Sequence, residues 1–511
     1  MKLFLRLSTL QPLAFVVLNL LATTANGITD DEFDAVLKGA LADSKIRGAA
    51  VAFRSPSQQT FARGYGKTAA SDDSSDVTAD TAFMLASVSK VFTGAAVAVL
   101  LDQGIIQSLD DNICDVMPDT YSDTACRNPS FPSVDVTWRM MATHRSSLMP
   151  DIDLVTDNMG QNVSASYGPT GGYTEEAPAA GNPTCPLLDV QGFYRDIMID
   201  KESETMVGRD GLMVADTNAP LNWYDFADFD GGVWNMDESP GSYSDYSNFA
   251  MGYIAALVEH ATGQSFEDFC KAHIFSKLGM SGTSWFRESL PQGTEVAVPV
   301  YALESGGYAD VGHYCFIDYA SGQLYSTAND MAKWAEAILT LGTPSLWSEA
   351  TSKNVFGCQE KDANGNVLDD SSCSFALAWE LLNNEKRDDM IADHFNHEEE
   401  NWLEPFKDMD WTNGVMHSGY EEGCLTQLLV LPNAGVYSVV LINTSEYDDF
   451  APQEVTLKMA TALLANAGGT RNDKGDLLSG ADTQTSSSTR IRIKEIYSLA
   501  FYLFGVAVYL V

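Results

Sequence analysis

Residues 83–100 read FMLASVSKVFTGAAVAVL, a stretch that contains the only Ser-x-x-Lys of the chain, from Ser87 to Lys90. From Val88 onward the apolar residues recur three and four positions apart, and Gly104 follows as a stop signal. This period predicts a buried helix that begins at Ser87. Three residues are close to one helical turn, so the Lys90 amine would lie on the same face as the Ser87 hydroxyl.

The pairing of Ser87 with Lys90 suits nucleophilic catalysis. A serine hydroxyl is a weak nucleophile until a neighbouring base takes its proton. The start of a helix also presents unpaired backbone N–H groups and the positive end of the helix dipole to a developing negative charge. The stretch therefore predicts acyl transfer on Ser87, but so short a pattern also recurs by chance and needs partners elsewhere in the chain.

The composition is that of an acidic protein with one large domain or two modest ones. The 511 residues are 45% hydrophobic, and 70 acidic against 30 basic side chains give a net charge of −40. Phosphate binding needs clustered Lys and Arg, so this balance argues against nucleic acid as a partner and disfavours anionic lipid surfaces. It favours a well-solvated surface, with a cationic substrate as the alternative.

Both ends of the chain have the features of targeting segments. Lys2 and Arg6 precede an apolar run and then small residues up to Gly27, which predicts a signal peptide over residues 1–27. Residues 479–511 combine small residues, a polar spacer and an apolar end, which predicts a glycolipid (GPI-like) anchor signal, with a short membrane tail as the alternative. We expect a secreted or cell-surface protein that contacts the membrane only through this tail or its lipid.

Eight cysteines in an exported chain are expected to form disulfides. Cys114 with Cys126, and Cys358 with Cys373, are close enough in sequence to close local loops. The connectivity of the other four is left open by the sequence. The chain contains no Cys-x-x-Cys, so thiol redox work and Cys-rich zinc sites are disfavoured.

Two further patterns concern modification and metal binding. Asn162 and Asn443 begin sequons and are predicted glycosylation acceptors. His394 and His397, followed by three glutamates, could be interpreted as metal ligands, but two histidines in an acidic insertion are more typical of a solvated loop. We predict no metal and no cofactor.

Strand patterns lie toward both ends of the chain, with helix patterns between them. Apolar runs at 49–53, 425–431 and 436–442 predict strands, and the last two are joined by a Pro-Asn-Ala-Gly turn. Residues 249–262 and 331–341 predict helices. The pattern indicates one sheet built from both ends of the chain, with a mostly helical insertion.

We therefore expect one hydrolase domain over residues 28–478. Its sheet part would comprise about residues 28–85 plus 320–470, and its helical part about residues 86–319. Residues 150–240 and 384–412 are rich in polar and turn-forming residues and are interpreted as surface insertions.

Two motifs supply candidate partners for Ser87. Tyr246-Ser247-Asn248 is the only Tyr-x-Asn of the chain and directly precedes a predicted helix. A tyrosine oxygen near a lysine ammonium loses its proton more easily, and an asparagine amide can both donate to and accept from a substrate amide. His417-Ser418-Gly419 precedes the last strand pair, where N–H groups on an edge strand could complete an oxyanion hole begun by the Ser87 N–H.

The three motifs, in this order, resemble the serine β-lactamase and penicillin-binding-protein superfamily, in the branch of class C β-lactamases, D,D-carboxypeptidases, D-aminopeptidases and related esterases. Four segments are similar to family segments: residues 83–87 (FMLAS) to Phe-x-x-Ala-Ser, 143–148 (THRSSL) to Thr-His-Thr-Ser-Gly-Leu, 274–280 (IFSKLGM) to Ile-x-x-Pro-Leu-Gly-Met, and 322–333 (GQLYSTANDMAK) to Gly-Gly-Leu-x-Ser-Thr-Ala-x-Asp-Met-Ala-x. The resemblance covers roughly residues 35–465 and implies an α/β (α+β) fold of the β-lactamase/transpeptidase-like type. In that fold an antiparallel sheet is flanked by N- and C-terminal helices and carries a mostly helical inserted domain.

The resemblance also implies roles for individual residues. Ser87 would be the acylated nucleophile, and Lys90 would be its proton acceptor or the electrostatic partner of the base. Tyr246 would be the shared acid and base, and the sequence leaves open which of Lys90 and Tyr246 is the true base. Asn248 would hold the substrate amide. His417 would stand where β-lactamases keep the Lys of Lys-Thr-Gly.

The remaining positions of the third motif complete the substrate and oxyanion site. Ser418 and Gly419 follow His417 as the family's Thr and Gly follow its Lys. The second oxyanion donor of the family comes after that triad, which places it on Tyr420 here.

The exchange of that Lys for His417 decides the expected substrate. It removes a permanent positive charge, so a substrate carboxylate is held less firmly near neutral pH. The resemblance thus implies an exported serine hydrolase, an esterase or peptidase/amidase, for small ester or D-amino acid/peptide substrates. Two alternatives stay open: a β-lactamase or D,D-carboxypeptidase, and a catalytically inactive surface binding protein of the same fold.

Overall fold

The computed structural model describes residues 45–54, 60–117, 125–148, 234–303, 306–314, 318–360, 373–388 and 409–446, together with Asp34 and Lys38. Several predictions lie outside these residues: the signal peptide, the anchor signal, the flanking terminal helices, the sequon at Asn162, the histidines at 394 and 397, and most of the two insertions.

A seven-stranded antiparallel sheet forms the centre of the described structure, in the order β2-β1-β11-β10-β9-β8-β7. β1 pairs with β11, so strands from near both ends of the chain meet inside one sheet, as predicted. The apolar run of β1 follows from this position, because nearly all of its residues are buried. The strands are β1 (Gly48–Arg54), β2 (Thr60–Gly66), β7 (Phe375–Ala376), β8 (Trp379–Leu382), β9 (Gly414–Glu421), β10 (Cys424–Leu431) and β11 (Val436–Ile442).

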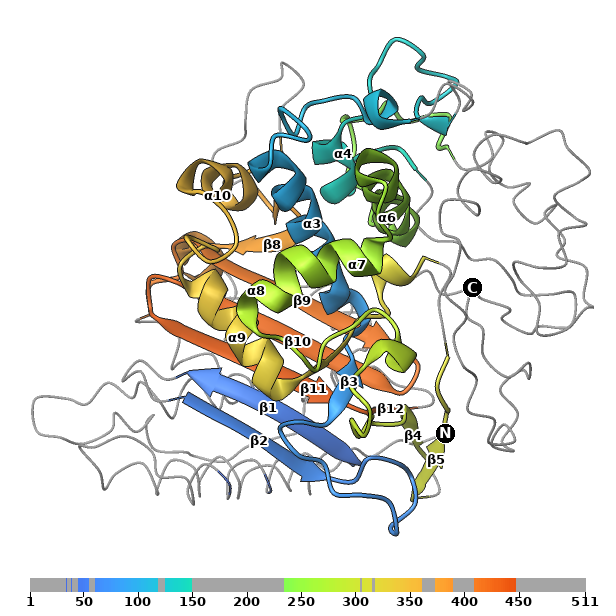
Figure 1. Cartoon of the computed structure of the whole chain (residues 1–511), viewed down its shortest axis with the longest axis vertical. Coiled ribbons are helices and arrows are strands. Elements are labelled where there is room, and N and C mark those ends of the chain that lie inside the picture. The colour runs from blue at the N-terminus through green and yellow to red at the C-terminus, as the bar shows by residue number, and fades with distance from the viewer. Residues whose placement is uncertain are drawn as a thin grey trace, which may run out of the picture.

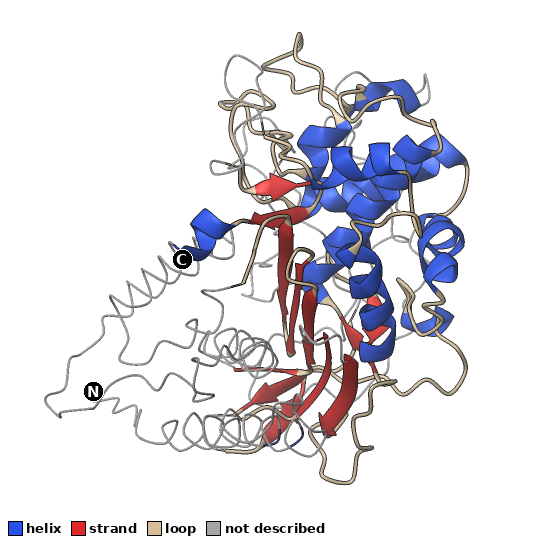
Figure 2. Ribbon diagram, turned by 90° about the vertical axis from the view of Figure 1, so that its left-hand side faces the viewer, coloured by secondary structure: helices blue, strands red, loops and turns tan. Residues whose placement is uncertain are grey.

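Most of the described helices lie on one side of this sheet (Figure 2). α9 packs along β1, β10 and β11, and α3 packs against α6 (Figure 1). None of the helices among the described residues is long and apolar enough to cross a membrane. The helices are α3 (Lys90–Asp102), α4 (Trp138–Ala142), α6 (Asn248–Thr262), α7 (Phe266–Cys270), α8 (Ser276–Leu278), α9 (Ala328–Leu339) and α10 (Glu349–Phe356).

The predicted helices are present, with small shifts at their starts. Residues Ala86–Ser89 form a 3₁₀ turn, and the α-helix proper begins at Lys90. The chain reaches that turn through Ala86, whose φ of 47° lies in the left-handed region. α9 begins three residues before its predicted start because the Thr327 side chain caps it by accepting the Asp330 N–H at 3.1 Å.

Two smaller sheets flank the large one. β3 (Ala82–Met84) pairs with β6 (Tyr325–Thr327), and each strand leads into one of the helices α3 and α9. β4 (Val300–Ala302) pairs with β5 (Tyr308–Asp310) and with β12 (Thr444–Glu446). The β3–β6 pair therefore fixes the point at which the chain enters the Ser-x-x-Lys turn.

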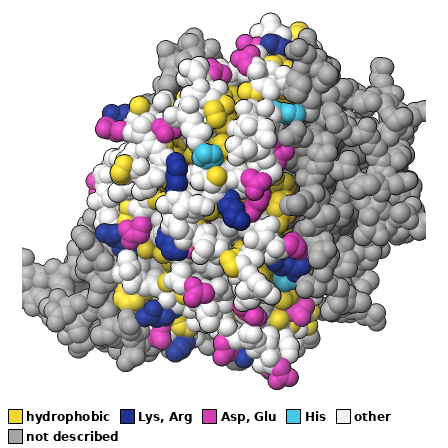
Figure 3. Space-filling view, viewed as in Figure 1, with side chains coloured by type: hydrophobic (Ala, Val, Ile, Leu, Met, Phe, Trp, Pro, Cys, Tyr) yellow, Lys and Arg dark blue, Asp and Glu magenta, His cyan; other side chains and the backbone are white. Residues whose placement is uncertain are grey.

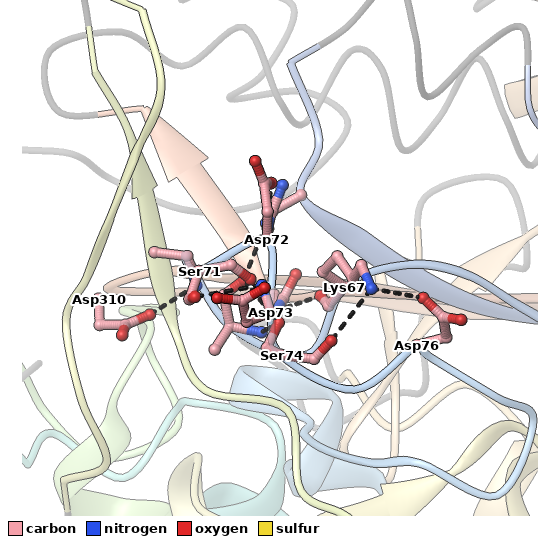
Figure 4. A network of polar contacts seen from close by, with 11 residues as sticks. Lys67, Ser71, Asp72, Asp73, Ser74, Asp76 and Asp310 are labelled. Atoms are coloured by element: carbon pink, nitrogen blue, oxygen red, sulfur yellow. Dashed lines mark hydrogen bonds and ion pairs between the residues drawn. The ribbon is translucent and has the colours of Figure 1, made fainter.

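A polar loop over residues 67–76 follows β2 and lies at the surface (Figure 4). Lys67 Nζ lies 2.8 Å from Asp76 Oδ1 and donates to the Ser74 carbonyl at 3.1 Å. The Ala70 N–H donates to Asp310 Oδ1 at 2.7 Å, which ties the loop to β5. Charged side chains of both signs are interspersed over the described part of the face in Figure 3.

The two predicted disulfides form. Cys114 bonds to Cys126, and Cys358 bonds to Cys373. Cys270 and Cys424 are buried free thiols, and burial raises the pKa of both. These two thiols are therefore poor nucleophiles.

The prediction of glycosylation at Asn443 is wrong for the folded chain. The Asn443 side chain is buried, and its Nδ2 donates to the carbonyls of Lys67 at 3.2 Å and Val298 at 3.1 Å. Both donors of the amide that would carry the sugar are engaged inside the protein. Asn443 thus connects the segment after β11 to the residue that follows β2 and to the segment that precedes β4.

Candidate active site

Ser87 lies in the 3₁₀ turn between β3 and α3, directly ahead of the buried Lys90. Lys90 Nζ donates to Ser87 Oγ at 3.0 Å and to the Ser321 carbonyl at 2.8 Å. The predicted one-turn spacing therefore does bring the amine to the hydroxyl. Because the amine end has left water completely, its contacts with these oxygens have to replace its hydration.

The start of α3 is held by hydrogen bonds to the segment that precedes α9. Thr93, one turn after Lys90, donates from Oγ1 to the Ala320 carbonyl at 2.7 Å. Ser89 Oγ accepts the Leu324 N–H at 3.0 Å. Residues 320–324 thus fix both the turn that carries Ser87 and the amine beside it.

Tyr246 covers Lys90 from the side of α6. The Lys90 Nζ lies 4.8 Å from the centroid of the Tyr246 ring, which is within cation–π range. Ser247 then caps α6 by accepting the Ala250 N–H at 2.9 Å. Asn248, half-buried, is the first residue of that helix. The Tyr-x-Asn motif therefore stands at the start of a helix, as its position in the sequence predicts.

His144 lies behind Tyr246 and was not singled out by its chemistry in the sequence. The two rings are stacked, with centroids 4.3 Å apart. His144 Nδ1 accepts the Ser247 N–H at 3.0 Å. Burial, reinforced by the charges of Lys90 and then His417, holds the pKa of His144 well below its usual range. His144 is therefore a neutral imidazole.

The third motif lies on β9, which passes directly over the residues before Ser87. A Cβ on Gly419 would lie 2.6 Å from the Leu85 carbonyl oxygen and 2.9 Å from the Ala86 Cβ, so only glycine fits there. Thr426 of β10 donates to the same Leu85 carbonyl at 2.5 Å. This close crossing places residue 420 next to the turn that carries Ser87.

The expectation of an edge strand is wrong for β9 as a whole, because it is the fifth of seven strands. However, β8 pairs with β9 only from Gly414 to Met416. Among the described strands, residues 417–421 pair with β10 alone. This part of β9 keeps one side without a strand partner in the described sheet.

His417 is buried and uncharged. Its Nδ1 lies 2.7 Å from the Ser418 carbonyl oxygen, and burial, followed by the charge of Lys90, lowers the pKa of His417 to about 3. Side chains alternate along a strand, so His417 and Gly419 share the face that meets Ser87. The side chains of Ser418 and Tyr420 lie on the other face.

A family model described as Beta-lactamase matches residues 33–176 and 215–463. The chain belongs to the Beta-lactamase family. Its fold is the β-lactamase/transpeptidase-like fold that the motifs implied, and the match supports membership of a hydrolase family.

Relatives of this Beta-lactamase family member are distant in sequence. Beta-lactamase-like protein 4 of Dictyostelium discoideum is 23% identical over 345 residues, which cover 62% of this chain and 47% of the relative. The octameric penicillin-binding protein homologue from Pyrococcus abyssi superposes with a TM-score of 0.55 at 18% identity, over 88% of this chain and 79% of that chain. D-amino acid amidase from Ochrobactrum anthropi SV3 superposes with a TM-score of 0.54 at 18% sequence identity, over 85% of this chain and 98% of that chain. The chain spans about half the length of the curated relatives it matches.

Three residues around the candidate active site of this Beta-lactamase family member had no assigned role from the sequence: His144, Ser321 and Thr426. His144 carried a signal, because it stands in the family-like segment THRSSL. Ser321 contributes a backbone carbonyl, which no side-chain pattern can reveal. Thr426 is one of several polar residues in a buried strand, and only the folded structure shows that its hydroxyl donates to the Leu85 carbonyl.

Proposed function

We propose that the chain is an exported serine hydrolase that forms an acyl-enzyme on Ser87 and acts on small esters or on D-amino acid and peptide amides. The observation that carries the proposal is the 3.0 Å contact between Lys90 Nζ and Ser87 Oγ, with the Tyr246 ring against the same nitrogen. Lys90 lies at hydrogen-bond distance from the serine and Tyr246 packs against Lys90, so these are the two groups that could take the proton.

The reaction begins when the Ser87 proton passes to Lys90 or Tyr246 and Oγ bonds to the substrate carbonyl carbon. The π electrons of the carbonyl move to its oxygen, where the N–H groups of Ser87 and Tyr420 would hold the charge. Collapse of this intermediate breaks the bond to the alcohol or amine, which leaves with the proton. Water then cleaves the acyl ester by the same sequence of transfers and frees Ser87.

The neutral His417 supports the proposed substrate class. With its pKa lowered to about 3, this side chain offers no positive charge to a substrate carboxylate near pH 7. Esters and amides without a carboxylate next to the scissile bond would therefore bind as well here as at a site with Lys in this position. The carboxylate of a β-lactam would lack the ion pair that such a Lys provides. The fold shared with a D-amino acid amidase agrees with this choice.

Export is part of the proposal. Two disulfides among the described residues support an oxidising compartment, where such bonds persist. We propose that residues 1–27 direct export, that residues 479–511 provide a GPI-like anchor, and that Asn162 is the glycosylation acceptor of the mature chain. The proposed partner is a small substrate, with no nucleic acid.

Covalent labelling tests the proposal. Purified wild-type protein and Ser87→Ala are treated with a fluorophosphonate probe and a fluorescent penicillin, and both are assayed with p-nitrophenyl esters and D-amino acid amides. Ser71→Ala, in the surface loop, serves as the serine control. We expect fluorophosphonate labelling and turnover that only Ser87→Ala abolishes.

Each other outcome selects one of the alternatives. Penicillin labelling with rapid release would replace the proposal with a β-lactamase. Neither labelling nor turnover in wild-type protein would leave the inactive binding protein. Within an active enzyme, Lys90→Met and Tyr246→Phe identify the base, because the true base is needed even for acylation by an activated ester.

A further inference from the structure

Two hydrogen bonds to one residue bracket Tyr246 in the chain. The Asp245 N–H donates to the His144 carbonyl oxygen at 2.8 Å, and the Ser247 N–H donates to His144 Nδ1 at 3.0 Å. The residues on both sides of Tyr246 are thus held by His144. The backbone on either side of the tyrosine therefore cannot shift without breaking one of these two bonds.

The Tyr246 ring is held as firmly as its backbone. It lies between the His144 imidazole, with ring centroids 4.3 Å apart, and the Lys90 Nζ, 4.8 Å from its centroid. His144 is only 3% exposed, so its imidazole is shielded from bulk water, while Tyr246 is half-buried. A change in the position of the imidazole would be passed directly to the ring that covers the amine.

The position of His144 is itself fixed by its neighbours. Its backbone φ of 57° lies in the left-handed region, where a non-glycine residue persists only if the surroundings hold it. The next residue, Arg145, donates from Nη2 to the Gly241 carbonyl at 2.9 Å and from Nη1 to Glu360 Oε1 at 3.0 Å. The ring of Phe375 meets the imidazole edge-on, with centroids 5.8 Å apart.

We infer that His144 is a positioning residue, whose neutral imidazole accepts the Ser247 N–H through Nδ1 and thereby keeps Tyr246 against Lys90. This inference rests on the proposed function of Ser87, Lys90 and Tyr246. A backbone N–H can only donate, so Nδ1 has to carry the lone pair and the proton of the ring belongs on Nε2. The essential property of residue 144 is therefore an acceptor at the position of Nδ1.

Asparagine and leucine separate this property from simple packing. The two side chains have nearly the same shape, but only asparagine offers an oxygen close to the place of Nδ1. Asparagine also tolerates the left-handed backbone. We therefore compare His144→Asn with His144→Leu, and use His144→Ala if the leucine variant does not fold. His273→Asn and His273→Leu, near the opposite end of α3, are the matched controls.

Two measurements test the inference. Amide hydrogen exchange of the peptide that covers residues 245–250 reports the Ser247 bond without any need for activity. We expect His144→Leu to speed this exchange at least tenfold and His144→Asn to stay within threefold of wild type. With a p-nitrophenyl ester, we expect kcat to fall about 100-fold in His144→Leu, with KM within threefold, and to recover at least tenfold in His144→Asn.

The outcomes distinguish this inference from the proposed function. Equal exchange in the Asn and Leu variants, or equal kcat values with Ser87 still essential, would overturn the role of His144 alone. A loss of kcat as large in His273→Leu as in His144→Leu would also overturn it. Activity that survives Ser87→Ala would overturn the proposed function, while the exchange experiment still decides whether His144 holds the Tyr246 loop.

Discussion

Two lysines of this chain make similar contacts in opposite surroundings. Lys90 is fully buried and donates to a hydroxyl and a carbonyl beside an aromatic ring. Lys67 also donates to a carbonyl, but its partner Asp76 is 82% exposed and the lysine side chain is 31% exposed. Water can replace every contact of Lys67 and none of those of Lys90.

The difference shows where a polar contact matters. An exposed ion pair gains little, because water screens it and both side chains lose rotamer freedom. A buried amine has given up its hydration, so removing one of its contacts or moving a neighbour leaves it without a replacement and changes its position relative to Ser87. The large effects of substitution should therefore cluster around residues 85–90 and fall off toward the loop at 67–76.

Among substitutions of the residues around Ser87, the largest effect is expected for Lys90→Met. This variant keeps the length of the side chain and removes the amine, so kcat/KM for an activated ester should fall about 10²- to 10⁴-fold. Lys67→Met should leave kcat/KM within twofold. Steady-state kinetics on both proteins check this. Comparable losses of kcat/KM in the two variants would contradict the distinction between the buried and the exposed lysine.

Gly419→Ala is expected to cost both stability and activity. The new methyl group would meet the Leu85 carbonyl and the Ala86 Cβ, and overpacking of this kind costs about 1 to 3 kcal/mol. Gly435→Ala meets no atom within 4 Å, although its φ of 69° adds a left-handed backbone cost that Gly419 does not have. Urea unfolding measures both variants, and a Gly419→Ala protein as stable as wild type would mean that β9 does not pack tightly on the turn that carries Ser87.

Buried His417 predicts a dependence of stability on pH. Its pKa is about 3 in the folded chain and near 6.5 when unfolded, so the unfolded state binds the extra proton between these values. Stability is therefore lost as pH falls from 6.5 toward 3, by up to about 1.4 kcal/mol per pH unit for this group. His417→Gln removes the contribution, and unfolding curves at pH 7 and pH 5 measure the difference. If the free energy of unfolding fell by the same amount between pH 7 and pH 5 in wild type and in His417→Gln, a neutral, buried His417 would be contradicted.

Thr426 allows a smaller, isosteric test. Thr426→Val removes the hydrogen bond to the Leu85 carbonyl without changing the volume of the side chain, which should cost about 1 kcal/mol of unfolding free energy. Thr426→Ser keeps the donor and should retain more of kcat than the valine variant. If Thr426→Val and Thr426→Ser have the same kcat, the Thr426 hydroxyl does not contribute to the position of Ser87.

The smallest effect is expected for Asp76→Asn in the exposed pair. The free energy of unfolding should change by about 0 to 1 kcal/mol at low salt, and by less at 1 M salt because exposed charges are screened. Thermal unfolding at two salt concentrations measures it. A loss of unfolding free energy larger than that of Thr426→Val would show that the exposure of a contact does not predict how much it stabilises the fold.

Local patterns predicted much of the catalytic framework. The 3.6-residue period after Ser87 predicted α3, and the one-turn spacing predicted the contact with Lys90. The apolar runs with the Pro-Asn-Ala-Gly turn predicted β10 and β11. Each of these signals depends only on residues that lie close together in the sequence, so a local pattern is enough to reveal it.

Contacts between distant segments were beyond local patterns. The left-handed Ala86 arises because β3 must turn sharply into α3 beneath Gly419. Asn443 has a correct sequon, and only the carbonyls of Lys67 and Val298 decide that its amide is buried. The imidazole of His144 accepts the backbone N–H of residue 247. In all three cases the deciding partner lies on another element.

The pairing of β1 with β11 has a consequence for how the chain folds. Ala49 lies opposite Ile442, so the inner part of the sheet closes only when segments from near both ends of the chain meet. Closing so long a loop is entropically costly and slow, and until it happens β10 and β11 present an open apolar edge. A nascent chain stalled before residue 436 has a β1–β2 hairpin with no third strand. We therefore expect such chains to depend on chaperones or to aggregate.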